Sequence, residues 1–172
     1  FHAANRAIYE ASHKQPRLNG MGTTCTALVI HEGLAFSAQV GDSRLYLVRG
    51  DEIYLMSEDH SAVMEMVRCG LMTLDDARHH ADKNILLRAL GTQPKVNVAK
   101  WQSPFPVLEG DCFVLCSDGL YDLVADEEIK RVVTEHAPHA CECLLALAKE
   151  RGGHDNITVG VLRLESKRLT EA

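Results

Sequence analysis

Closely spaced strand-like runs constrain the fold of this chain more than any other feature of its sequence. Runs rich in β-branched and other apolar residues occur at 23–31, 34–40, 44–48 and 53–56. They are separated by the short turn segments Glu32-Gly33, Gly41-Asp42-Ser43 and Gly50-Asp51. A parallel connection needs a crossover of a dozen or more residues, so turns this short favour antiparallel neighbours. We therefore expect an antiparallel meander over residues 23–56.

Helices are predicted on both sides of the strands. Residues 1–13 carry apolar side chains at helical spacing, and residues 126–136 and 139–149 show comparable patterns. Further strands are expected at 111–117 and 157–164, and the segment KVNVAKW alternates as a strand does. Strands grouped together, with helices at either end, favour an α+β fold over a βαβ repeat.

The chain is expected to form a single domain over residues 1–172. It has 172 residues, of which 46% are hydrophobic, and this is enough for one substantial core. The segment 61–83 departs from the strand pattern. It predicts a short helix that stops at Gly70 and a second helix capped by Thr73, and this segment forms a small excursion from the sheet.

Composition excludes several classes of function. A net charge of −6 leaves no basic surface for nucleic acid, and no apolar stretch is long enough to cross a bilayer. The opening FHAANRAIYEASHK has no signal-peptide pattern, so we expect a cytoplasmic protein whose six cysteines are free thiols. His136, His139 and Cys143 would share one helix face and offer an alternative zinc site, although Pro138 interrupts the spacing.

Three aspartates stand at the ends of predicted strands. Asp42 follows the run ending AQVG, Asp118 follows FVLCS, and Asp155 precedes the closing strand in RGGHDNITVGVL. Each aspartate on its own is also typical of a turn. Taken together, carboxylates held at the ends of buried strands form the rigid oxygen donors that Mg²⁺ or Mn²⁺ prefers.

Five segments in order resemble the type 2C metal-dependent protein serine/threonine phosphatases. They are GMGTTCTALVI, AQVGDSRLYLVRGDEIYLMSEDHS, NILLRALG, GDCFVLCSDGLYDLV and GGHDNITVGVL. The resemblance runs from about residue 1 to residue 164. It implies an antiparallel β-sandwich flanked by helices, a centre of two Mn²⁺ or Mg²⁺ ions at one end of the sandwich, and a flap over residues 61–83.

The resemblance also assigns roles to the three aspartates. Asp118 matches the S-D-G aspartate that coordinates the metal pair, and Asp155 matches the D-N aspartate of the same centre. Asp42 matches the G-D-S-R aspartate that helps to hold a third, weaker metal. The implied reaction is hydrolysis of phosphoserine or phosphothreonine in proteins by a metal-activated water. The resemblance also implies a phosphoprotein substrate, a partner serine/threonine kinase and a part in signal transduction.

The chain departs from the family at one motif. The first acidic metal ligand and the D-G-x-G-G-H segment of the family do not occur in this sequence. The histidine general acid and the phosphate-binding arginine are absent with them, so we assign no catalytic residue in this chain. His154 is not a substitute, because it belongs to the D-N motif, and His60 in EDHS is interpreted as loop structure. We expect an N-terminally truncated domain; the alternative is a pseudophosphatase that serves as a regulatory or binding module.

Overall fold

The structure is a computed structural model, and it describes residues 1–165. The chain divides into two compact units. The first unit consists of Phe1–Val29, Phe36–Ser43 and Glu58–Ser103, and the second of Ile30–Ala35, Arg44–Ser57 and Pro104–Ala172. The expectation of one domain over residues 1–172 therefore stays a prediction. None of the helices in the described part is long and apolar enough to cross a membrane.

The strands form two sheets in which every described pairing is antiparallel. One sheet has the order β1-β2-β5, with β6 also paired to β2, and comprises β1 (Cys25–His31), β2 (Leu34–Val40), β5 (Ala99–Lys100) and β6 (Phe105–Pro106). The other has the order β4-β3-β7-β8 and comprises β3 (Arg44–Arg49), β4 (Glu52–Leu55), β7 (Cys112–Cys116) and β8 (Val159–Arg163). The mixture of helices and antiparallel sheets confirms the α+β prediction.

The predicted continuous meander is wrong at the turn after β2. The hairpins β1–β2 and β3–β4 both form, but β2 and β3 belong to different sheets. The reason is that β3 pairs with β4 along one edge and with β7 along the other, so neither edge is left for β2. The run KVNVAKW also forms less strand than expected, since only Ala99 and Lys100 pair with β2.

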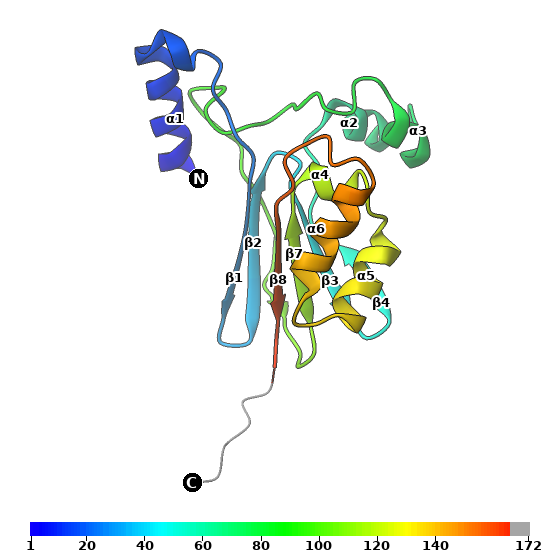
Figure 1. The fold of residues 1–172 in the computed structure, drawn as a ribbon. Coiled ribbons are helices and arrows are strands. Elements are labelled where there is room, and N and C mark those ends of the chain that lie inside the picture. Colours follow the sequence, from blue (N-terminus) through cyan, green and yellow to red (C-terminus); the bar gives the residue numbers. More distant parts are fainter. Residues whose placement is uncertain (166–172) are drawn as a thin grey trace. The chain divides into compact units, whose positions relative to one another are not determined.

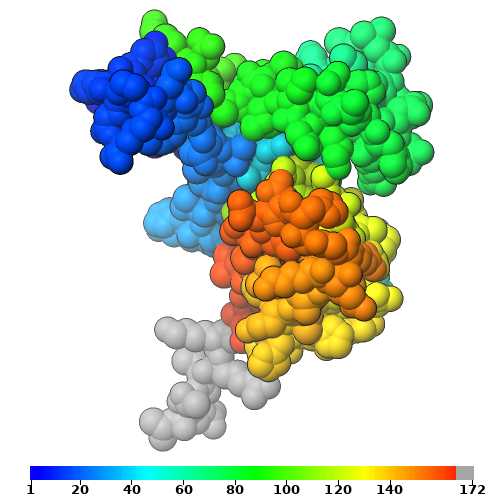
Figure 2. Space-filling view, turned by 45° about the horizontal axis from the view of Figure 1, so that its top comes forward, coloured from blue at the N-terminus to red at the C-terminus, as the bar shows by residue number. Residues whose placement is uncertain are grey.

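Three helices cover one face of the β4-β3-β7-β8 sheet within the second unit (Figure 1). They are α4 (Asp118–Tyr121), α5 (Asp126–Glu135) and α6 (Ala140–Glu150). The helix α5 turns Ile129, Val132 and Val133 inward, which is the spacing of an amphipathic helix. Figure 2 shows the outer surfaces of α5 and α6, in yellow and orange, lying side by side. Each fully buried aliphatic side chain in this core contributes roughly 1.5–3 kcal/mol.

The strand register shows which residues lie at each end of this sheet. Arg44 on β3 pairs with Cys116 on β7, and Cys116 pairs with Val159 on β8. The turn after β7 and the turn before β8 therefore lie at the same end of the sheet. Residues Asp111 and Arg49 lie at the opposite end, because Val48 pairs with Cys112.

The first unit contains α1 (His2–Lys14), the short 3₁₀ helix η1 (Pro16–Leu18), α2 (Ala62–Arg68) and α3 (Leu74–His79). Both helices predicted within residues 61–83 are present. The Ser61 hydroxyl accepts the Met64 N–H at the start of α2, and Thr73 and Asp76 form a capping box at the start of α3. Gly70 follows α2 with a φ of 69°, a conformation that favours glycine.

Candidate metal centre

The buried strand β7 delivers Asp118 to the end of the sheet. Phe113 and Val114 in this strand have no exposed surface, and the strand is paired on both edges. The strand ends at Cys116, Ser117 remains extended, and Asp118 is the first residue of α4. A carboxylate mounted on such a strand has little freedom to move, as a metal ligand requires.

The loop before β8 is bonded directly to the Ser117-Asp118-Gly119 turn. The Ser117 N–H donates to the Thr158 carbonyl at 3.0 Å, and the Thr158 N–H donates to the Ser117 hydroxyl oxygen at 3.0 Å. The same hydroxyl donates to the Asn156 carbonyl at 3.1 Å. Ser117 therefore bonds the two turns to each other, as serine commonly does in turns.

Gly119 brings the two turns into close contact. A Cβ atom added at Gly119 would lie 2.5 Å from the Asn156 carbonyl oxygen, much closer than any real contact. Asn156 directly follows Asp155, so the absence of a side chain at Gly119 allows the aspartate-bearing turns to approach. This close approach gives Gly119 a role that its place in a turn motif alone does not show.

The electrostatics of Asp118 suit a cation. Its side chain is half-buried, and burial, followed by the nearby Asp155 and Asp122 carboxylates, holds the pKa of Asp118 above its usual range. The Gly119 N–H donates to Asp118 Oδ1 at 2.9 Å but does not reverse this effect. A divalent cation would offset the clustered charge, and carboxylate oxygens are the donors that Mg²⁺ and Mn²⁺ take.

Asp122 belongs to this carboxylate cluster, and it was not among the site residues predicted from the sequence. Its signal was available, because Asp118 and Asp122 stand four residues apart and the Asp122 N–H donates to the Asp118 carbonyl at 2.9 Å. Asp155 is exposed, and its Oδ1 accepts the Asn156 N–H at 2.6 Å. Within residues 1–165 there is no group of three or more His, Cys, Asp or Glu side chains arranged to hold a metal ion. Asp118 and Asp155 thus offer part of a coordination shell, and waters occupy other positions around Mg²⁺ in most sites.

Asp42 lies in the first unit, in a turn held by several bonds. The Gly41 N–H donates to His60 Nδ1 at 3.1 Å, and the Ser43 carbonyl accepts the Thr26 hydroxyl at 2.7 Å. Burial, followed by the charge of Arg88, lowers the pKa of His60, so His60 accepts this bond as a neutral ring. The predicted role of Asp42 at a third metal, together with Asp118, stays a prediction.

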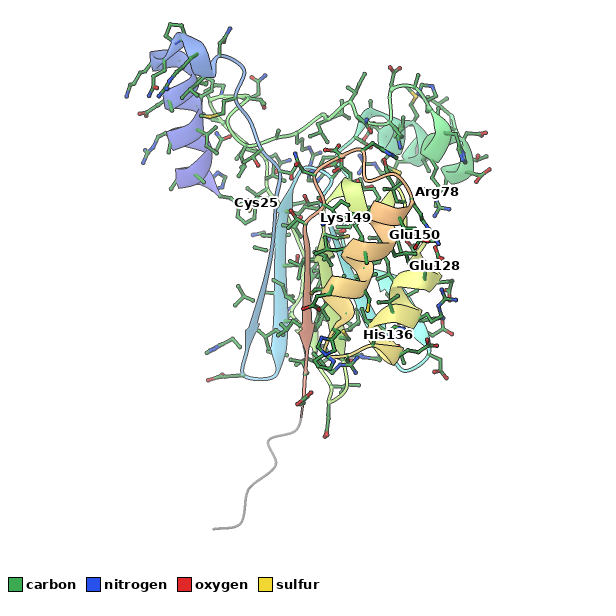
Figure 3. The ribbon with its side chains drawn as sticks, viewed as in Figure 1. Cys25, Arg78, Glu128, His136, Lys149 and Glu150 are labelled. Carbon is green, nitrogen blue, oxygen red and sulfur yellow. The ribbon has the colours of Figure 1, made fainter. Side chains whose placement is uncertain are left out.

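The alternative zinc site finds no support. His136 follows the last residue of α5, while His139 and Cys143 lie at the start of α6. In Figure 3, His136 lies at one end of the helix pair, and Lys149 and Glu150 lie at the other, close to the end that carries α4. The three zinc candidates form no metal-binding group in the part of the chain that the structure describes.

Comparison with known proteins agrees with this architecture. The family model described as Protein phosphatase 2C matches residues 2–159. The serine/threonine phosphatase stp of Listeria innocua is 40% identical over 161 residues, which cover 90% of this chain and 62% of that protein.

Solved structures show the same fold. A serine/threonine phosphatase from S. agalactiae has 36% identity and a TM-score of 0.89, and the match covers 95% of this chain and 67% of that one. The catalytic domain of the phosphatase PstP, in complex with two manganese ions, has 34% identity and a TM-score of 0.81, with 93% of this chain and 66% of that one covered. These likenesses confirm the predicted type 2C phosphatase-like fold class.

The match covers nearly all of this chain but not all of its relatives. The chain spans about 62% of the length of the Listeria innocua relative. The family model nevertheless matches far more than half of the 172 residues, and it includes the Asp42, Asp118 and Asp155 motifs. This chain belongs to the protein phosphatase 2C family.

Proposed function

We propose that this chain is part of a protein serine/threonine phosphatase that hydrolyses phosphoserine and phosphothreonine in proteins. The observation that carries the proposal is the pairing of the Asp118 and Asp155 turns at one end of a sheet, in a chain of the protein phosphatase 2C family. Its relatives in Listeria innocua and S. agalactiae are described as serine/threonine phosphatases.

The cofactor in this proposal is Mn²⁺ or Mg²⁺ in a two-metal centre. Asp118 and Asp155 would hold the metal pair, and Asp42 would join Asp118 at a third ion. The PstP catalytic domain in complex with two manganese ions supports this choice of metal. Divalent cations in such a centre make water nucleophilic at neutral pH and offset the negative charge of the phosphoryl oxygens.

The residues of the chain explain why a cation must be present before substrate. Asp118, Asp155 and Asp122 together place negative charge where a phosphoryl group would approach. Like charges at short distance repel, so the uncompensated cluster disfavours a phosphate dianion. The Ser117 hydroxyl bonds the two carboxylate turns to each other, and Gly119 leaves room for their close approach.

Substrate choice and biological setting belong to the same proposal. The substrates would be phosphoproteins of a partner serine/threonine kinase, in cytoplasmic signal transduction. The flap at residues 61–83 would shape the choice among them, since α2 and α3 leave the strand pattern and present exposed side chains such as Leu71 and Leu74. The relatives give no support to the alternative of a pseudophosphatase module.

The test is a Mn²⁺-dependent assay of phosphate release from a phosphoserine peptide. We expect little activity from the 172-residue chain, because it contains no D-G-x-G-G-H segment. A chimera with a family segment that contains this motif, joined ahead of residue 1, should be active. Asp118→Asn in the chimera should abolish most of this activity, whereas Glu109→Gln removes one exposed acidic charge at the other end of the sheet and should not. An inactive chimera that folds and binds Mn²⁺ would overturn the proposal.

A further inference from the structure

We propose that Arg44 is a positioning residue that holds α4, and with it Asp118, through the ring of Tyr121. The inference rests on the proposed function, since it adds a supporting residue to the same metal centre. The arginine belongs to the G-D-S-R segment and stands two residues after Asp42.

The contacts of Arg44 join β3 to two helices. Its guanidinium carbon lies 3.8 Å from the centre of the Tyr121 ring, a cation–π contact with the last residue of α4. Its Nη1 donates to the Tyr46 hydroxyl at 3.0 Å, and this hydroxyl donates to Asp126 Oδ1 at 3.1 Å. Asp126 is the first residue of α5, so one arginine links the strand to the end of α4 and the beginning of α5.

Tyr46 keeps this link in one arrangement. Its side chain is fully buried, and burial is the main cause that raises its pKa far above the usual range. The hydroxyl therefore stays protonated at every ordinary pH and can both accept from Arg44 and donate to Asp126. Because this buried hydroxyl makes both hydrogen bonds, it leaves no polar group unsatisfied.

The helix α4 needs support of this kind. It contains only four residues, and a single helical turn is not stable in isolation. Leu120 and Val124 are fully buried in the core, while Gly119 lies against Asn156. The stacking of Arg44 on Tyr121 adds a further contact to this turn. Asp118 begins the helix, so a shift of this turn would move a proposed metal ligand.

The charge of Arg44 makes the inference testable. A positive charge near the site repels a divalent cation, so an electrostatic role alone predicts that loss of the charge would strengthen Mn²⁺ binding. A positioning role predicts weaker binding even when the charge is kept. Arg44→Lys keeps the charge but removes the flat, stacking guanidinium, and Tyr121→Leu removes the ring without changing a charge.

A matched control occurs on the same strand. Arg49 at the other end of β3 also lies over an aromatic ring, with its guanidinium carbon 4.8 Å from the centre of Phe105. It donates to the Asp111 carboxylate and to the Pro106 carbonyl, away from the carboxylate cluster. Arg49→Lys is therefore the same substitution in the same strand and should leave the metal centre unchanged.

The experiment titrates MnCl₂ into the 172-residue chain by calorimetry and follows amide hydrogen exchange of α4 without metal. In Arg44→Lys and Tyr121→Leu we expect the Mn²⁺ dissociation constant to rise by about fivefold, the size of effect that a lost cation–π contact supports. Exchange at residues 119–124 should accelerate in both variants. The double variant should show less than the sum of the two effects, because both remove one contact. Arg49→Lys should leave the Mn²⁺ dissociation constant unchanged.

The outcomes separate this inference from the proposed function. Unchanged α4 exchange in both variants, or faster exchange with unchanged Mn²⁺ affinity, would overturn the inference and leave the phosphatase proposal intact. Mn²⁺ binding that Asp118→Asn does not weaken would overturn the assigned metal site, and the exchange data would then decide the role of Arg44. Stronger Mn²⁺ binding by Arg44→Gln with normal α4 exchange would show that the arginine acts by charge alone.

Discussion

Two aspartates flank the same buried strand, and their surroundings are opposite. Asp111 precedes β7 and is 1% exposed. Its carboxylate accepts from Arg49 Nε and Nη2, both at 2.7 Å, and from the Leu108 N–H at 2.8 Å. Burial alone would raise the pKa of Asp111, but these bonds outweigh it and hold the pKa below its usual range.

Asp118 follows β7 and has acidic neighbours where Asp111 has a basic one. Burial and the carboxylates of Asp155 and Asp122 hold its pKa above the usual range. The strand thus carries a charge neutralised by the protein at one end and a charge that remains to be neutralised at the other. Ionisable groups with strained electrostatics cluster at functional sites, whereas fully bonded ones stabilise the fold.

One cavity of this unit lies at the Arg49–Asp111 end of the strand. A cavity of about 310 Å³ is lined by residues that include Val48, Arg49, Asp111 and Arg163. Arg49 and Asp111 already satisfy each other there, and Arg163 donates to the Val133 carbonyl. The Asp118 and Asp155 turns lie at the other end of the sheet, away from this cavity.

The largest expected effect on stability comes from breaking the ion pair between Arg49 and Asp111. Asp111→Asn should lower the free energy of unfolding by about 3 kcal/mol, because it leaves the half-buried Arg49 without its counter-charge. Asp118→Asn should leave stability without metal unchanged or slightly higher, because it removes like-charge repulsion. Urea unfolding of both variants in EDTA measures the difference, and an equal loss in both would contradict the contrast between the two ends.

Gly119→Ala should have the next largest effect. The added methyl group would collide with the Asn156 carbonyl and push the two aspartate turns apart. We expect a loss of about 2 kcal/mol in stability, as for other overpacked sites, with weaker Mn²⁺ binding. Gly160→Ala is the control, since nothing lies within 4 Å of a Cβ at Gly160. Unaltered Mn²⁺ binding in Gly119→Ala would show that the closeness of the turns does not matter.

The two ends also show what could be predicted from sequence. Local patterns were sufficient for α1, α2, α3, α5 and α6, for the Thr73 cap and for the position of Asp118 after an apolar strand, but not for α4 or the Ser61 cap. The sheet assignment of β2 failed because β3 finds its second partner in β7, far along the chain. The bonds of Ser117 to Asn156 and Thr158, and of Arg49 to Asp111, likewise join distant segments. No local spacing encodes such pairings, so the opposite electrostatics of Asp111 and Asp118 became visible only in the structure.

Acid should weaken the ion pair between Arg49 and Asp111. The folded-state pKa of Asp111 lies below its unfolded value, so its contribution to stability is present above the unfolded pKa and is lost as pH falls through the folded pKa. We expect the stability difference between the parent and Asp111→Asn to be constant near neutral pH and to shrink below about pH 4. Urea midpoints measured across this range in EDTA provide the test. A difference that persists undiminished at low pH would mean that Arg49 does not act through the ionised carboxylate.

The smallest effect is expected from an ion pair on the surface of the same unit. Glu128, labelled in Figure 3, accepts from Arg151 Nη1 and Nη2 at 2.6 Å each, and these bonds lower the pKa of Glu128 to about 2. Arg151 directly follows α6, so its bonds to Glu128 join the end of α6 to α5. Arg151 also donates to the Leu123 carbonyl at 2.8 Å, in the segment between α4 and α5. Its side chains remain 26% and 37% exposed, and water and salt therefore weaken their attraction. We expect Glu128→Gln to lower the melting temperature by about 1–2 °C, and the difference should vanish at about 0.5 M salt. A loss of stability as large as that of Asp111→Asn, or one that salt does not reduce, would contradict this prediction. It would mean that the exposed Glu128–Arg151 pair stabilises the fold as strongly as the buried Arg49–Asp111 pair.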